Sequence, residues 1–218
     1  NQLLLVASVI DDPVTTTDEL IPSGETSSLR SNPIKLAQFA LSRKDPKYVG
    51  RAHEAQALED ERREAAENKA ELSAAAKSVL AHASESDISK IALGSCIFAV
   101  KPGDGSAREQ AASSQKMLGG QANVAREYAT KRYRSNLVNW GMAPWIVGDA
   151  DRAKFKTGAW LFIPGVRAFA SGDNTEIEAE LLDGGTRLPV TLSLPGVTRG
   201  ERDMLLAGCL MNAYRNDK

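Results

Sequence analysis

The chain alternates between apolar runs that suit strands and stretches whose apolar residues recur at helical spacing. Six apolar runs predict strands, at residues 3–10, 91–100, 122–128, 160–163, 176–182 and 187–194. Helical patterns begin at Pro33, span 107–117 and 130–142, and fill the last segment after a capping box at Thr198–Glu201. Strands of mixed spacing interleaved with helices predict an α/β domain.

The segment Ala52–Ala83 is rich in alanine, glutamate and arginine, and it predicts one long charged helix. Apolar residues recur along it every seven positions and form a thin stripe: Leu58, Ala65, Leu72 and Val79. We interpret the run EDERREAAENK, residues 59–69, as the solvated face of this helix. A coiled-coil partner is an open alternative, although so few small apolar residues make a weak seam.

Composition narrows the class of protein. The chain has 218 residues and a net charge of -1, which suits one domain and gives no support to nucleic acid or membrane as a partner. The two cysteines, Cys96 and Cys209, are predicted to be buried free thiols, too few to hold zinc or an iron–sulfur cluster. This cysteine usage favours a cytoplasmic location. The apolar run 3–10 lacks the features of a signal peptide, and we expect a strand exposed by cutting a longer chain.

The stretch KPGDGSAREQA, residues 101–111, joins a predicted strand to a predicted helix. Gly103 and Gly105 allow a tight turn, and Ser106 and Arg108 follow them. A strand, a glycine turn and a helix start together present backbone N–H groups and partial positive charge to an anion. The alternative is structural, with Ser106 as the helix N-cap and Arg108 as a surface residue.

Two further segments carry candidate chemistry. The polar stretch 11–33 is too long for a simple turn and holds Asp18 and Arg30, a carboxylate and a guanidinium that could serve a shared site. A solvated loop is the alternative. Residues 131–134 place three basic side chains around Tyr133, a pattern that suits RNA binding or an ordinary surface.

Three segments together resemble the aconitase superfamily, namely VTTTDELIPSG, GDGSAREQAASSQKMLGGQANVAREYA with its continuation SNLVNWGM, and LLAGCLMN. They are similar to the family motifs T-T-D-x-I, G-x-G-S-S-R-E-H-A, Leu-Gly-Gly and T-N-L-x-x-x-G. These motifs mark the C-terminal swivel domain, which is also the isopropylmalate isomerase small subunit. The resemblance implies a swivelling β/β/α fold in which residues 1–218 form one domain of a longer chain and residues 52–83 are a charged helical insertion.

The resemblance also implies a hydro-lyase or isomerase that dehydrates and rehydrates a small hydroxy-polycarboxylate. In the family a four-iron, four-sulfur cluster on other domains acts as a Lewis acid, and a serine alkoxide removes the proton. By this resemblance the chain binds no cluster itself, works with the cluster-bearing domains, and is inactive alone. Two alternatives are a stand-alone isopropylmalate isomerase-like small subunit and a non-catalytic regulatory or RNA-binding homologue.

Matching the motifs assigns roles to single residues. Ser106 stands at the catalytic base, and Arg108 at the arginine that supports it and binds a substrate carboxylate. Arg30 matches a substrate-binding arginine of the first loop, and Ala107 stands at a substrate-contacting serine. The supporting positions are Asp18, Gly103 and Gly105. Departures from the motifs at Ala107, Gln110, Glu19 and Ile21 leave the substrate unassigned.

Overall fold

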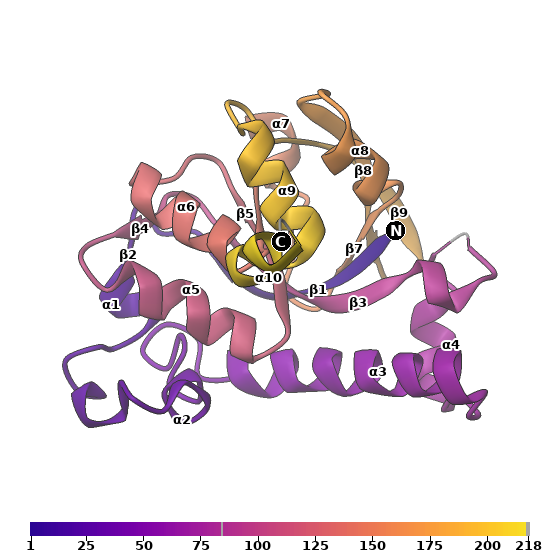
Figure 1. Ribbon diagram of the computed structural model, residues 1–218, viewed down its shortest axis with the longest axis horizontal. Coiled ribbons are helices and arrows are strands. Elements are labelled where there is room, and N and C mark those ends of the chain that lie inside the picture. Colours follow the sequence, from indigo (N-terminus) through magenta and orange to yellow (C-terminus); the bar gives the residue numbers. More distant parts are fainter. Residues whose placement is uncertain (84, 217–218) are drawn as a thin grey trace.

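The computed structural model describes residues 1–83 and 85–216 and is built around a closed barrel of seven strands (Figure 1). Going round the barrel, the strands are β1 (Gln2–Ile10), β3 (Ala92–Ala99), β5 (Gly120–Ala125), β6 (Ala143–Val147), β9 (Thr186–Ser193), β8 (Glu176–Asp183) and β7 (Trp160–Ile163). The first four run parallel, and the remaining pairs, including β7 with β1, are antiparallel. The carboxyl ends of β1, β3, β5 and β6 therefore meet at one end of the barrel.

Helices cover the barrel and close its ends. They are α1 (Thr17–Leu20), α2 (Pro33–Ala37), α3 (Tyr48–Asn68), α4 (Ala74–Leu80), α5 (Arg108–Met117), α6 (Lys131–Asn139), α7 (Asp149–Arg152), α8 (Val166–Ser171), α9 (Arg199–Ala207) and α10 (Leu210–Asn216), with 3-10 turns at Ser27–Leu29 and Ile88–Lys90. In Figure 1, α3 runs beneath β1 and β3, while α9 and α10 lie in front of the barrel. None of the described helices is long and apolar enough to cross a membrane.

A small apolar core packs Leu80 of α4 against β1, β3, β7 and β8, and two larger cores hold the rest of the layers together. One fills the barrel and includes Phe98, Trp145 and Leu161, with Phe98 stacked on Phe155 at 5.0 Å between ring centroids. The other lies outside the barrel, between its parallel strands and the helices α2, α3, α5 and α6. The apolar runs at residues 3–10 and 91–100 belong to strands with core on both faces, which explains why neither run alternates with polar residues.

The α/β fold class is confirmed. The prediction of one continuous helix over residues 52–83 is wrong. The chain forms two helices instead, because α3 ends at Asn68 and Lys69 takes a left-handed conformation with a φ of 57°. The second helix, α4, begins after Ser73 caps it by accepting from the Ala76 amide. All residues of the predicted segment 52–83 are described, and Ser84, which follows it, is outside the described residues.

The charged run 59–69 is not purely a solvated face. Glu59 and Arg62 are buried where α3 packs against β3, and they form an ion pair with each other. The sequence pattern also missed β6, because Pro144 and the preceding helical pattern argued for a helix end rather than a strand. The terminal helix is likewise divided, at Gly208, into α9 and α10.

Candidate functional site

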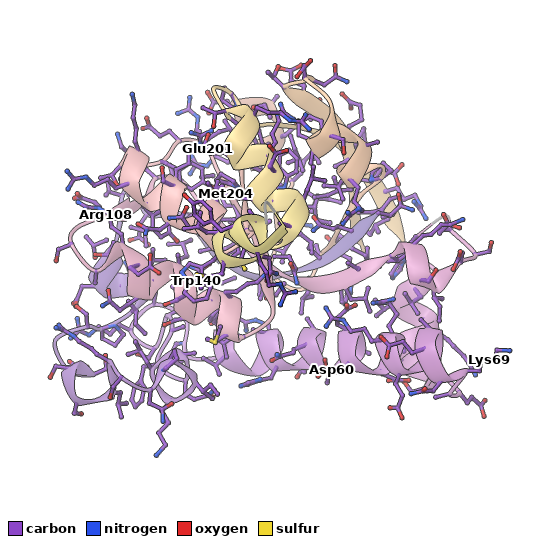
Figure 2. All side chains as sticks on the ribbon, in the orientation of Figure 1. Asp60, Lys69, Arg108, Trp140, Glu201 and Met204 are labelled. Carbon is purple, nitrogen blue, oxygen red and sulfur yellow. The ribbon has the colours of Figure 1, made fainter. Side chains whose placement is uncertain are left out.

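The glycine turn lies at the carboxyl end of β3, the end of the barrel where loops from all four parallel strands gather. It begins with the short strand β4 (Pro102–Asp104), which pairs in parallel with β2 (Thr15–Thr16) of the first loop. That pairing brings α1 against the start of α5. Figure 2 places Arg108 on the side of the molecule where β2, β4 and α1 gather in Figure 1.

Two glycines are required by the shape of this turn. Gly103 has a φ of +97° and Gly105 a φ of +121°. These backbone conformations are strained for any residue that has a side chain. A Cβ atom on Gly103 would come within 2.3 Å of the Tyr133 ring, and one on Gly105 within 2.4 Å of the Thr17 hydroxyl. The turn is thus packed onto α6 through Tyr133 and onto α1 through Thr17.

The hydroxyl of Ser106 is exposed, and no hydrogen bond joins it to any of the described residues. The N-cap of α5 is Ala107, which has no side-chain acceptor, so Ser106 does not cap the helix. The Ala107 amide donates to the Thr17 hydroxyl at 3.3 Å, and the first-turn amides that follow have no side-chain cap. An open hydroxyl therefore lies beside uncapped N–H groups and the positive end of a helix dipole.

Arg108 is half-buried in the first turn of α5. Its Nε atom is buried and finds no hydrogen-bond acceptor among residues 1–83 and 85–216, and its guanidinium forms no ion pair with any residue there. A buried guanidinium N–H without an acceptor is costly, so this group is set up to receive an anion from outside the chain. Together with the uncapped amides it can bind a carboxylate.

The other two predicted charges bind partners outside the glycine turn. Asp18 is exposed and pairs with Arg43, which also binds Glu25 at 2.5 Å. Arg30 is exposed and donates to the Ser23 carbonyl at 3.4 Å. Among the described residues, no hydrogen bond or ion pair joins Asp18 or Arg30 to Ser106 or Arg108, so their roles stay predictions.

Ion pairs anchor the first loop, and sequence reasoning missed the residues that make them. The Lys44 Nζ atom lies 2.9 Å from a carboxylate oxygen of Asp12 and 2.9 Å from one of Glu19. The neighbouring Arg43 forms ion pairs with two other carboxylates. Burial opposes the ionisation of Glu19, but hydrogen bonds from Thr16 and Lys44 outweigh it and hold its pKa below the usual range. The available signal was charge: a basic pair at 43–44 follows a loop rich in carboxylates.

Tyr133 supports the turn from beneath and is fully buried, which corrects the view of residues 131–134 as a basic and aromatic surface. Its hydroxyl accepts from the side-chain amides of Asn123 at 2.8 Å and Gln115 at 3.0 Å. Burial raises the pKa of Tyr133, so the phenol stays neutral. The cluster thereby loses the aromatic ring that could have stacked on a base.

Glu109, in the first turn of α5, links that helix to α6. It accepts from the Trp140 indole at 2.6 Å and from the Asn136 side chain. Trp140, labelled in Figure 2, therefore lies close to the glycine turn through its bond to Glu109. Sequence reasoning assigned none of these three residues a role.

The described residues do not make a metal site of their own. Across residues 1–83 and 85–216, no group of three or more His, Cys, Asp or Glu side chains converges. Cys96 lies inside the barrel, where burial raises its pKa to about 12, and Cys209 is partly exposed between α9 and α10. The iron–sulfur cluster implied by the resemblance does not fit the ligands found in this part of the chain.

Comparisons with known proteins relate this chain to a known family and a known fold. A family model described as the aconitase C-terminal domain matches residues 59–147, the stretch that contains the glycine turn, α5 and α6. The fold is similar to a crystal structure of 3-isopropylmalate dehydratase (leuD) from Methanocaldococcus jannaschii, with a TM-score of 0.57 and 20% identity over 96% of this chain and 92% of that chain. A search of curated protein sequences finds no match. The two comparisons thus relate the middle of the chain, residues 59–147, to the aconitase C-terminal domain, and they relate the fold of nearly the whole chain to that of the dehydratase.

Proposed function

We propose that this chain is the swivel portion of an aconitase-family hydro-lyase or isomerase that dehydrates and rehydrates a hydroxy-polycarboxylate. The observation that carries the proposal is the start of α5, where an open serine hydroxyl and an unpaired, half-buried arginine lie within the stretch matched by the family model. The substrate polycarboxylate stays unassigned, because Ala107 offers a methyl group where a hydroxyl could have contacted it.

Ser106 acts in this proposal as the general base. Its Oγ, as an alkoxide, takes the proton from the carbon next to a substrate carboxylate and returns it on the reverse step. A serine hydroxyl is far too weak an acid to ionise at neutral pH unless nearby positive charge favours the alkoxide. The uncapped amides of α5 and the Arg108 guanidinium supply that charge.

Arg108 also holds the substrate in the proposed site. Its buried Nε has no acceptor among the described residues, so a substrate carboxylate can bind there without displacing a protein partner. The rigid packing of Gly103 on Tyr133 and of Gly105 on Thr17 fixes Ser106 and Arg108 relative to each other. That rigidity supports catalysis, because the base has to meet one particular proton of the bound substrate.

The proposed enzyme needs an iron–sulfur cluster, whose iron supplies a Lewis acid for the departing hydroxyl group. The described cysteines of this chain do not fit such a cluster, so the proposal assigns it to cluster-bearing domains on the same polypeptide or on a separate subunit. The separate-subunit arrangement is supported by the similarity to a dehydratase chain of nearly the same extent. On either arrangement the chain alone is expected to be inactive.

Ser106→Ala in the complete enzyme tests the assignment of the base. We expect turnover to fall by about 10²-fold or more, with the substrate KM little changed, because a general base acts mainly in the transition state. The free energy of unfolding should change by less than about 0.5 kcal/mol, since the exposed hydroxyl has no protein partner in the described chain.

Ser86→Ala is the matched control, because Ser86 is also exposed but lies in the turn after α4. It should leave both turnover and unfolding unchanged. Unchanged turnover in Ser106→Ala would contradict the assignment of the base. Arg108→Lys should raise KM as well as lower turnover, because an ammonium cannot reproduce the planar, two-pronged contact with a carboxylate.

A further inference from the structure

Thr17, the first residue of α1, contacts the chain on both sides of Ser106. Its hydroxyl accepts a hydrogen bond from the Ala107 amide at 3.3 Å, between residues 90 positions apart. The same oxygen lies 2.4 Å from the place that a Cβ atom on Gly105 would take, so the glycine packs closely against it. Thr17 is only 2% exposed. The two residues that flank the proposed base therefore meet one buried oxygen atom of the first loop.

The position of Thr17 is fixed by its neighbours in the first loop. A capping box surrounds the start of α1, in which the Thr16 amide donates to the Glu19 carboxylate at 2.7 Å and the Glu19 amide donates to the Thr16 hydroxyl at 3.2 Å. The Thr15 amide donates to the Lys101 carbonyl at 3.0 Å, next to the pairing of β2 with β4. A hydroxyl presented by a segment anchored in this way can hold the glycine turn in one place.

The bond to Thr17 also divides the amides at the start of α5. The Ala107 amide has its acceptor, whereas the amides of residues 108–110 find none among residues 1–83 and 85–216. These three amides are the free N–H groups that can stabilise negative charge at Ser106. A shift of about 1 Å at a reacting group can lower a rate about 10²-fold, so the hold on Ala107 matters for the base.

We propose that Thr17 is a positioning residue for the general base. Its hydroxyl holds the backbone on either side of Ser106, and the serine oxygen thereby stays beside the free amides and Arg108. This inference rests on the proposed function, because it concerns the same base. It adds a residue of the first loop that acts through the turn and not on the substrate.

Ser106→Cys in the complete enzyme provides a probe that needs no substrate. Iodoacetamide modifies the thiolate form, so the labelling rate as a function of pH gives the pKa of the introduced thiol, and peptide mass spectrometry reads each cysteine separately. We expect this pKa to lie below the ordinary thiol value of about 8.5, because free amides and a guanidinium favour the anion. Cys209, which is partly exposed, is the internal reference.

Substitutions of Thr17 are then added to Ser106→Cys. Thr17→Val replaces the hydroxyl with a methyl group and leaves the Ala107 amide without its acceptor, so the pKa of the introduced thiol should rise by about one unit. Thr17→Ser keeps the oxygen and should keep the low pKa. Thr17→Ala removes the oxygen without placing a methyl group against Gly105, so it tests the hydrogen bond even where the valine variant fails to fold, and it should raise the pKa in the same direction.

Thr15→Val is the matched control. Thr15 is also a buried threonine of the first loop, but its hydroxyl has no hydrogen-bond partner in the described part of the chain, so its loss should leave the pKa of the introduced thiol unchanged. An equal rise with Thr15→Val, or no rise with Thr17→Val and Thr17→Ala, would overturn the positioning role and leave the proposed base standing. An ordinary pKa in Ser106→Cys alone would contradict the proposed base, and this inference with it.

Turnover of the complete enzyme gives a second test. Thr17→Ala should lower turnover about tenfold or more with KM little changed, because it moves the base without removing a contact to the substrate. The same substitution in the Ser106→Ala background should cause no further loss, since the residue acts through Ser106. A purely structural role would lower the activity in both backgrounds by the same factor, and that result would overturn the proposal.

Discussion

Glu59→Gln offers a sharp test of how α3 is attached to the barrel. The Glu59 carboxylate is 6% exposed and accepts four hydrogen bonds. Two come from Arg62, at 2.7 and 2.9 Å, one from Arg63 at 2.6 Å, and one from the Leu93 amide of β3 at 2.8 Å. A glutamine presents one acceptor oxygen and one donor group to the same donors, and it leaves Arg62 buried without a counter-charge.

The expected cost is about 3–5 kcal/mol, the usual penalty for removing one partner of a buried ion pair. That is a large part of the roughly 5–15 kcal/mol that stabilises a typical domain. Chemical denaturation should show a lower midpoint with an unchanged m-value. The matched control is Glu64→Gln on the exposed side of α3, which should cost less than about 0.5 kcal/mol.

The stabilisation that Glu59 provides should also depend on pH. Burial disfavours the Glu59 carboxylate, but the hydrogen bonds from Arg62, Leu93 and Arg63 outweigh it and hold its pKa below the usual range. Because the folded pKa is the lower one, the stabilisation is complete above the ordinary glutamate pKa of about 4.3 and is lost as the pH falls through the folded pKa. The difference in stability between wild type and Glu59→Gln should therefore shrink in acid.

Two results would refute this account of Glu59. One is a cost no larger than that of Glu64→Gln, and the other is a cost that does not change with pH. Replacing both partners, as Glu59→Leu with Arg62→Met, separates the charge from the packing. The double variant should be more stable than either single one, since an apolar pair leaves no buried charge unpaired.

Two further outcomes follow from the packing of the turn and of the thiols. Gly105→Ala should lower the free energy of unfolding by about 1–3 kcal/mol, because alanine is strained at this φ and its Cβ atom meets the Thr17 hydroxyl. Gly24→Ala is the matched control, since the space around Gly24 is open, and it should not destabilise the fold. Thermal unfolding measures both effects. Equal effects at the two glycines would contradict the packing described for the turn. Thiol labelling of the native protein should modify Cys209 and spare Cys96, whose buried thiol has a pKa raised to about 12, until the chain unfolds. Rapid labelling of Cys96 in the folded protein would show that the barrel interior opens.

Local features of the fold could be predicted from the sequence. The apolar runs gave β1 and β3, and the hairpin turn at 183–186 joins β8 to β9 as expected, with Gly184 and Gly185 both at positive φ. The glycine turn before α5 was also predicted, because it depends on residues within a few positions of one another. The motifs around it carried the resemblance that the family model supports.

Other features could not be predicted, because they depend on contacts between distant segments. A charged run resembles a solvated helix face until β3 supplies an amide for Glu59 from 34 residues away. Tyr133 resembles a surface aromatic until α6 packs on the turn, and the ion pair of Asp18 with Arg43 joins residues 25 positions apart. Closure of the barrel is of the same kind, since β7 pairs with β1 across most of the chain.

The sequence by itself therefore determined that a serine and an arginine follow a glycine turn at the start of a helix, because backbone conformation and helix polarity are local properties. Only the tertiary structure decided which charges are buried and which arginines are left without partners among the described residues. Those outcomes are set by packing between segments far apart in the chain. The same residue is a solvated charge or a buried ion pair depending on what the fold places against it.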